Sequence, residues 1–397
     1  MFEAILSFIV TYKYILIFYL FIILFIVLHR KKIDVQGKII FLYRTKLGIA
    51  WMDKYSTKYR EWVILSGYIG IGVGFIGMLF ISFFLIKNIY DLIMVPQAAS
   101  GVSLVLPGIN VPGLGILPFW HWLVAIFVIA VVHEFSHGIV ARAHNVEVKN
   151  TGVVFFGPII GAFVEPNEKK MGKEKDTVQY SILAAGAFSN IILAMVAFLL
   201  LTFVLNPIQA EITETKGFTF ESYYNMSYPF AVAGIAVGTV ITGIDGKQTT
   251  NFQEFSEGLV NKKPGDSVVV EAGGKTYTLT LAANPEQPEK GFLGIMGIKN
   301  EVVAKPAFQS GLGIVGYYAV DVGAAFLRWL FLLSFGIGLF NLLPLPIVDG
   351  GRMVQTFMHK LKGVENGEKR YRQIGMFFLL LLVVSLVLPY LLKWMVV

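Results

Sequence analysis

The chain contains no cysteine, and only 15% of its 397 residues are charged. The missing thiols exclude disulfide bonds and thiolate metal ligands. The scarcity of charge, together with a hydrophobic content of 55%, is typical of a polytopic membrane protein. The formal net charge of +7 does not indicate nucleic-acid binding, because the basic residues gather in loops between long apolar runs, where they report membrane topology.

Six apolar runs are long enough to cross a bilayer, and each is expected to form a transmembrane helix. The first run lacks a small-residue cleavage site, so we predict a retained helix rather than a signal peptide. The loops alternate in charge: nine Lys or Arg residues fall within 30–61 and six within each of 142–177 and 344–374, whereas 87–117 has only Lys87. This alternation predicts cytoplasmic basic loops and outward-facing termini. The runs lie near residues 13–29, 62–86, 118–142, 178–205, 318–342 and 374–394.

The segment His133-Glu134-Phe135-Ser136-His137 lies inside the third apolar run. Helix residues four apart share a face, so both imidazoles can bind one metal ion. Glu134 can then reach a water on that ion, which is the arrangement of zinc hydrolases. Polar groups inside a membrane-length apolar segment are costly and usually functional. The pattern therefore predicts a Zn²⁺ cofactor, with Glu134 as the catalytic base.

Asp349 is the best candidate for a third metal ligand. The fifth apolar run ends in Asn341-Leu-Leu-Pro-Leu-Pro-Ile-Val-Asp349, where two prolines break the helix. We expect Asp349 to follow an extended segment at about the depth of His133 and His137, near the cytoplasmic end of the bundle. Two His and a carboxylate form a normal catalytic zinc shell. In the alternative interpretation, Asp349 only caps the helix that follows it.

Residues 151–164 form two apolar, β-prone arms around Gly157 and Pro158, which predicts a hairpin too short to span the membrane. Lipid does not tolerate an open hairpin edge, so this hairpin must be covered by protein or line a cavity. A substrate strand could add to its edge, or the hairpin could be a buried packing element. Asn190 follows a small-residue segment from Ala184 and could bond substrate near the metal, or make an ordinary interhelical hydrogen bond.

Segment 211–312 has 11 acidic and 8 basic residues and is predicted to be a small β-rich domain outside the membrane. Its order of strands, turns and one helix resembles a PDZ domain of the circularly permuted type, although Thr239 stands where Asp is usual. Gly291-Phe-Leu-Gly-Ile295 resembles the carboxylate-binding loop of such domains. A peptide terminus is therefore a candidate ligand, and a closing strand without a ligand is the alternative.

Together these motifs resemble the site-2 protease family of intramembrane zinc metalloproteases. Three motifs occur in the family's order, and the PDZ-like insert sits between the second and third core helices. The resemblance implies hydrolysis of peptide bonds in or near transmembrane segments of membrane-protein substrates. It does not extend to residues 1–117. The implied roles are zinc binding for His133, His137 and Asp349, water activation for Glu134, and substrate positioning for Asn190, Asn341 and the hairpin around Gly157 and Pro158.

The expected fold is an α-helical polytopic membrane protein with six transmembrane helices, a re-entrant β-hairpin and one extracytoplasmic PDZ-like α+β domain, in the cell membrane of a prokaryote. Two other functions remain open. A membrane-anchored protease with a site outside the bilayer is disfavoured by the apolar flanks of His133. A proteolytically silent metal-binding receptor or a zinc transporter would bind metal without turnover. The expected parts are 1–117 with two N-terminal helices, 118–210 with the metal helix, hairpin and second core helix, 211–312 with the PDZ-like domain, and 313–397 with the third core helix and the C-terminal helix.

Overall fold

The computed structural model describes residues 2–37, 39–94, 101–102, 106–108, 110–111, 115–156 and 159–396. The chain divides into two compact units. The first comprises Met1–Leu201 and Ala325–Val397, and the second comprises Thr202–Ala324. The predicted hairpin turn, Gly157 and Pro158, lies outside the described residues.

Five helices are long and apolar enough to cross a membrane, and they correspond to the second to sixth predicted runs. A further helix, α1 (Phe2–Leu28), includes the first predicted run, and a sixth crossing stays a prediction. The π-helical turn Leu201–Leu205 and α7 (Asn206–Ile212) continue α6. The five helices are α3 (Arg60–Met94), α4 (Phe119–Ala143), α6 (Asp176–Leu200), α10 (Gly311–Asn341) and α12 (Val364–Val396).

Small residues bring the helices of the first unit into close contact. Four buried glycines, spaced three or four residues apart, follow one side of α3. A methyl group on Gly67 would lie 2.2 Å from Ser181 Oγ of α6, so only glycine fits at this crossing. On α6, the run Ala184–Ala187 is buried as well. The glycines on α3 are Gly67, Gly70, Gly74 and Gly77.

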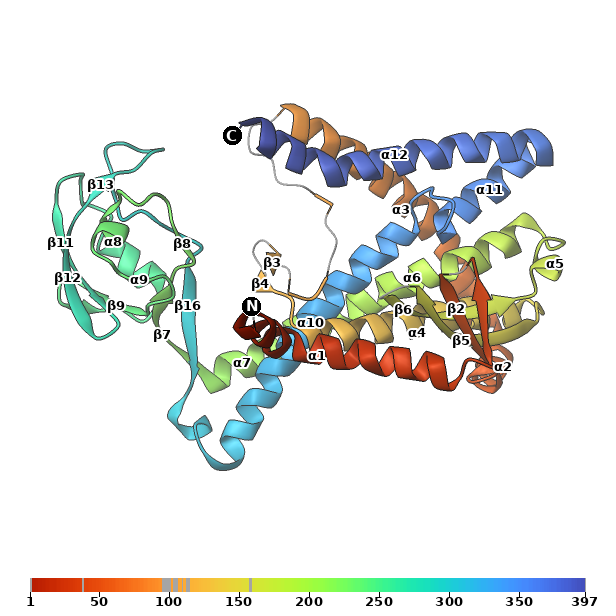
Figure 1. Cartoon of the computed structure of the whole chain (residues 1–397), viewed down its shortest axis with the longest axis horizontal. Coiled ribbons are helices and arrows are strands. Elements are labelled where there is room, and N and C mark those ends of the chain that lie inside the picture. Colours follow the sequence, from red (N-terminus) through yellow and green to blue (C-terminus); the bar gives the residue numbers. More distant parts are fainter. Residues whose placement is uncertain are drawn as a thin grey trace. The chain divides into compact units, whose positions relative to one another are not determined.

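A four-stranded antiparallel sheet lies beside α4 and is larger than the predicted hairpin (Figure 1). β5 (Val148–Phe156) and β6 (Ile159–Pro166) are the predicted arms. The other two strands, β1 (Ile33–Gln36) and β2 (Ile40–Thr45), come from the basic segment, where the sequence analysis expected none. β2 pairs with β5 from Ile40 opposite Phe156 to Thr45 opposite Thr151, so the sheet order is β1-β2-β5-β6.

A charged network crosses this sheet and ties its strands together. Arg44 of β2 contacts Asp34 of β1 at 2.7 Å and Glu165 of β6 at 3.4 Å. The Asn150 side chain of β5 donates to the same Glu165 carboxylate at 3.0 Å. The hydrogen bond from Arg44 holds the pKa of the Asp34 carboxyl below its ordinary value. The network helps fix the position of β6 beside α4.

Two glycines place the first turn of α11 (Asp349–Lys362) on the chain that precedes it. A Cβ on Gly350 would lie 2.3 Å from the carbonyl oxygen of Leu342, and a Cβ on Gly351 only 1.8 Å from that of Leu345. Any larger residue would push the helix away. Val348, in extended conformation, occupies the N-cap position, so Asp349 is the first helical residue and not the cap.

The second unit is built on a six-stranded sheet in the order β12-β11-β9-β7-β16, with β10 paired to β9. Its core is aromatic, with Phe218, Phe220, Phe230 and Phe255 all buried. The sheet strands are β7 (Thr213–Thr219), β9 (Ile241–Ile244), β10 (Lys247–Gln248), β11 (Ser267–Ala272), β12 (Lys275–Thr280) and β16 (Lys299–Ala304), and the helices beside it are α8 (Pro229–Val232) and α9 (Phe252–Glu257).

The remaining elements are short. In the first unit they are α2 (Ile49–Lys58), β3 (Asn110–Val111), β4 (Gly115–Ile116) and α5 (Glu168–Met171). In the second unit, β8 (Ser222–Tyr223) pairs with β15 (Ile295–Met296), β13 (Ala282–Ala283) pairs with β14 (Gly291–Phe292), and Pro306–Phe308 form a 3₁₀ turn.

Candidate metal centre

Three side chains from two helices meet inside the first unit. His133 and His137 lie one turn apart on α4, and Asp349 begins α11. Asp349 Oδ2 is 3.1 Å from His133 Nε2 and 3.2 Å from His137 Nε2. The two Nε2 atoms are themselves 3.2 Å apart. The structure therefore brings all three predicted ligands to one point, although Asp349 is far away in the sequence.

The chemistry and spacing of these atoms fit a zinc ion. Asp349 Oδ2 is buried and has no hydrogen-bond partner among the described residues, a costly state unless a cation compensates it. The ligand atoms of a tetrahedral zinc site with bonds of 2.0–2.1 Å lie about 3.3–3.4 Å apart. The three distances observed here, 3.1–3.2 Å, are close to that spacing. The three atoms would have to move apart only slightly to accommodate the ion.

A second contact orients each imidazole so that Nε2 faces the cluster. His137 Nδ1 lies 2.7 Å from the carbonyl oxygen of Ile182, to which it donates. His133 Nδ1 lies 3.0 Å from the side-chain amide of Asn190. Asn190 Oδ1 otherwise has no partner within the described chain, and turning the amide over lets this oxygen accept the Nδ1 proton. Both rings then offer an unprotonated Nε2, as metal-binding histidines do.

Asn190 is itself held in place by α10. It is completely buried, and its backbone carbonyl accepts a 2.8 Å hydrogen bond from the Ser334 hydroxyl. The sequence placed Asn190 near the metal but assigned it to substrate. The structure places its amide against His133, on the ring edge opposite Nε2. It is positioned to orient a ligand.

We expect Asn190→Leu to weaken zinc affinity by about 10- to 100-fold, because His133 would lose the acceptor that fixes its tautomer. Competition with a chromogenic chelator measures this affinity directly. Asn341→Leu is the matched control. Asn341 ends α10, is half-buried and is not among the described residues that line the cavity beside the metal ligands. Equal affinities in the two variants would contradict the role assigned to Asn190.

Gly186 of α6 forms the wall next to the two imidazoles. A Cβ at this position would lie 2.3 Å from His137 Nε2 and 2.5 Å from His133 Nε2, the two atoms that face the cluster. Glycine is therefore required if an ion is to occupy this space. Gly186 belongs to the small-residue segment that precedes Asn190, and only the three-dimensional contact shows that it borders the two imidazoles.

Glu134 connects the metal centre to the sheet. Its Oε2 accepts a 2.9 Å hydrogen bond from the backbone N–H of Val164 in β6. The carboxylate also lines a cavity of about 220 Å³ together with His137 and Asp349. The contact with Val164 engages only Oε2. Oε1 is thus available for a water molecule in the cavity, while the backbone contact holds the side chain.

Arg352 is a second polar group at this cavity and was not among the predicted site residues. It lies one turn after Asp349 on α11 and lines the cavity. Its guanidinium is 3.1 Å from a carboxylate oxygen of Glu168. The remaining walls are mostly apolar and are formed by Phe163, Val164, Pro166, Met171, Ile182 and Leu183.

Comparisons with known proteins identify the family of this chain. The model of peptidase family M50 matches residues 121–384. An uncharacterized protein of Methanocaldococcus jannaschii is 26% identical over 357 residues, covering 87% of this chain and 85% of the relative. A candidate zinc metalloprotease of Fusobacterium nucleatum is 24% identical over 318 residues, covering 67% and 91%. Zinc metalloprotease RasP of Oceanobacillus iheyensis is 23% identical over 269 residues, covering 56% and 61%.

Among solved structures, the PDZ domain of an SdrC-like protein from Listeria innocua is similar to 20% of this chain and 91% of its own, with 28% identity and a TM-score of 0.18. The M50 match runs from α4 into α12 and therefore includes both histidines and Asp349. The matched region also contains the long apolar helices α6 and α10. The chain belongs to peptidase family M50, the site-2 protease family of membrane zinc metalloproteases.

Proposed function

We propose that His133, His137 and Asp349 hold the zinc ion and that Glu134 is the general base for hydrolysis of peptide bonds in or near transmembrane segments. One observation carries this proposal: three acceptor atoms converge at 3.1–3.2 Å, and Glu134 lines the cavity that His137 and Asp349 also line. Zinc bound there would polarise the scissile carbonyl and lower the pKa of the attacking water.

Glu134 moves the proton in this scheme. Oε1 takes it from the water as the water attacks the carbonyl, and later delivers it to the leaving amine. The Val164 N–H at Oε2 keeps the carboxylate in place through both steps. Because Val164 belongs to an edge strand of the sheet, the base is aligned with the strand beside which an extended substrate would lie.

The edge of β6 offers a place for that substrate. The N–H of Val164 points to Glu134, away from β5. Backbone groups two residues apart on a strand point the same way, so Ala162 presents its N–H and C=O on this side as well. A substrate strand paired there would pass Glu134. A transmembrane helix must first unwind, because its own hydrogen bonds occupy its carbonyls, and pairing with β6 would offset part of that cost.

The proposal also includes the membrane topology and a peptide-binding role for the second unit. The Lys and Arg distribution supports cytoplasmic basic loops, with the termini and the second unit outside, in a cell membrane. The boundaries 211–312 are retained for a PDZ-like domain that binds a peptide terminus. Its support is the Gly291–Ile295 loop, where Gly294 has φ +79° and accepts a hydrogen bond from Tyr224 N at 2.8 Å.

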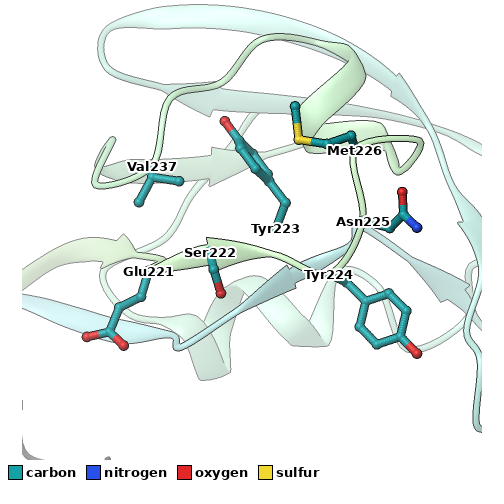
Figure 2. Close-up of a pocket in the computed structure, with 7 residues that line it drawn as sticks. All are labelled: Glu221, Ser222, Tyr223, Tyr224, Asn225, Met226 and Val237. Atoms are coloured by element: carbon teal, nitrogen blue, oxygen red, sulfur yellow. The ribbon is translucent and has the colours of Figure 1, made fainter. Parts of the chain in front are cut away.

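A pocket of about 500 Å³ lies next to this loop on the second unit (Figure 2). Tyr223 rises into it, and the Tyr223 hydroxyl donates to the carbonyl of Ile235 at 2.7 Å. β8, which carries Tyr223, pairs with β15 at the end of the loop. A peptide held by the loop would therefore have a partly apolar surface beside it. The pocket is lined by Glu221, Ser222, Tyr223, Tyr224, Asn225, Met226 and Val237.

Asp349→Ala tests the metal centre. Loss of a residue that hydrogen-bonds to a metal ligand can lower zinc affinity by up to about 100-fold. We expect a larger fall here, because the proposed ligand itself is removed. Zinc per chain is measured by atomic emission after dialysis, alongside cleavage of a model membrane substrate. Asp321→Asn is the control: this carboxylate lies on α10 and accepts from Gln209 in the second unit. Full zinc binding by wild type without any cleavage would instead support a metal-binding receptor or transporter.

A further inference from the structure

The helix α2 has one buried face and one exposed aromatic face. Met52 is completely buried, and Ser56, one turn later, is buried as well. On a neighbouring face, Trp51 and Tyr55 of α2 and Tyr59 at its C-cap follow each other at four-residue spacing, and Leu47 lies just before the N-cap Gly48. These four residues are called the aromatic stripe below, and their exposed fractions are 81% (Leu47), 63% (Trp51), 39% (Tyr55) and 43% (Tyr59).

The rings of the aromatic stripe are arranged side by side. The ring centroids of Trp51 and Tyr55 are 6.1 Å apart, and those of Tyr55 and Tyr59 are 6.2 Å apart with only 17° between the planes. Trp and Tyr combine an apolar body with a polar tip, which suits them to the interface between lipid and water. The stripe is a preformed surface of this kind.

Three exposed lysines flank the stripe: Lys46, Lys54 and Lys58. None of them forms an ion pair with any described residue, and Lys58 Nζ lies 5.1 Å from the centre of the Tyr59 ring. The neighbouring Arg44 is neutralised by Asp34 and Glu165. The surface therefore presents positive charge next to exposed aromatic rings, without acidic partners of its own.

The buried face of α2 rests on the metal helix. A Cβ on Gly138, the residue after His137, would lie 2.5 Å from Met52 Sδ. A Cβ on Gly48 would lie 2.3 Å from the Phe135 ring. Arg142 and Asp53 form an ion pair between the same two helices. Whatever binds the exposed face of α2 thus binds an element in direct contact with the metal-binding segment.

We propose that the aromatic stripe and Lys46, Lys54 and Lys58 form a binding surface for anionic phospholipid headgroups at the edge of the bilayer. Continuity supports a lipid rather than a protein partner: α2 ends at Lys58, and the transmembrane helix α3 begins at Arg60. The chain therefore enters the membrane directly after the stripe. A short amphipathic helix with lysines beside aromatic residues has the composition of an interfacial element.

The absence of cysteine allows a direct test. Thr57 is exposed on α2, so Thr57→Cys provides a unique position for a fluorescent dye on the full-length protein. The labelled protein is reconstituted in phosphatidylcholine vesicles that contain quencher-labelled phosphatidylglycerol or, separately, quencher-labelled phosphatidylcholine. We expect phosphatidylglycerol to quench more strongly. The preference should nearly vanish at about 1 M salt, where the Debye length falls to ~3 Å.

Two sets of variants separate charge from specific binding. Lys46→Gln, Lys54→Gln and Lys58→Gln together should reduce the preference for phosphatidylglycerol by at least about tenfold, since each lysine near an anionic surface contributes roughly fivefold. The matched control changes Lys169, Lys173 and Lys175 to Gln, which removes the same charge from another exposed segment and should leave the preference intact.

Three results would overturn the proposal. The first is equal quenching by both lipids in the wild type, and the second is an unchanged preference in the Lys46, Lys54 and Lys58 variant. The third is dye self-quenching that rises with protein density and masks lipid access, because it would show that a second copy covers the stripe. The measurement needs neither zinc nor a substrate, so its outcome is independent of the catalytic assignment.

Discussion

Glu134→Gln is expected to lower hydrolysis of a model membrane substrate by at least the 10²- to 10⁴-fold that general bases contribute, while zinc stays bound. The amide keeps the size of the side chain and can still accept the Val164 N–H through its oxygen. The amide is too weakly basic to take a proton from water at neutral pH. The loss is therefore one of chemistry and not of structure.

The two readouts must be made on the same sample. Zinc per chain and thermal stability should equal those of the wild type, and single-turnover cleavage should be lost. Glu168→Gln is the matched control, because Glu168 pairs with Arg352 outside the ring of metal ligands and its carboxylate is largely exposed. Wild-type turnover by the Glu134→Gln protein would remove Glu134 from the mechanism, and loss of zinc would show that Glu134 helps to hold the ion.

Gly186→Ala should weaken zinc binding strongly although it adds only one methyl group. The new Cβ would lie 2.3–2.5 Å from the Nε2 atoms of His137 and His133, well inside contact distance. Those atoms must either move apart or lose the ion between them. In a helix, alanine is otherwise preferred over glycine by about 1 kcal/mol. We therefore expect zinc affinity to fall more than about 100-fold, without a matching loss of helix stability. About 100-fold is the largest effect usually seen when only a residue that hydrogen-bonds to a metal ligand is lost.

Gly336→Ala on α10 is the matched control for Gly186→Ala. A Cβ there meets nothing within 4 Å, so this variant should keep its zinc and gain slightly in thermal stability. Isothermal titration with zinc, in parallel with thermal unfolding of the zinc-free proteins, separates the two effects. Zinc binding of normal affinity by Gly186→Ala would mean that the ion sits elsewhere than between the two imidazoles.

The metal centre was predictable from sequence because its geometry is mostly local. His133 and His137 are one helical turn apart, so helix geometry alone brings their side chains together. Asp349 needed one further step, the matching of depths in the membrane, and the structure places it within 3.2 Å of both rings. The five long apolar helices were equally accessible, since length and composition define them.

The contacts of Glu134 and Gly186 could not be predicted from the sequence, because they depend on how distant segments of the chain pack together. Nothing near Glu134 in the chain indicates that Val164 will donate to it, since that bond depends on the register of β6. Gly186 looked like a packing residue, and only the crossing of α6 over α4 places it against the imidazoles. Asn190 was given a substrate-binding role, whereas the structure places its side-chain amide 3.0 Å from His133 Nδ1, a contact that depends on how α6 packs against α4.

β1 and β2 were missed for another reason. Both lie within residues 30–61, which contain nine Lys or Arg residues. That charge count predicted a cytoplasmic loop and gave no reason to expect strands. Ile40–Thr45 is β-prone, but six residues without an evident partner predict little. Its partner, β5, begins more than a hundred residues later. The strand was therefore visible as a local preference, and its pairing was not.

The pairing of β2 with β5 means that the family-matched region is not a separable catalytic fragment. That region begins at residue 121, whereas β2 ends at Thr45. A chain shortened to the matched part would leave the backbone of β5 from Thr151 to Phe156 without its neighbour, as an unpaired sheet edge. The smallest working protease is therefore expected to extend well beyond the part that defines its ancestry.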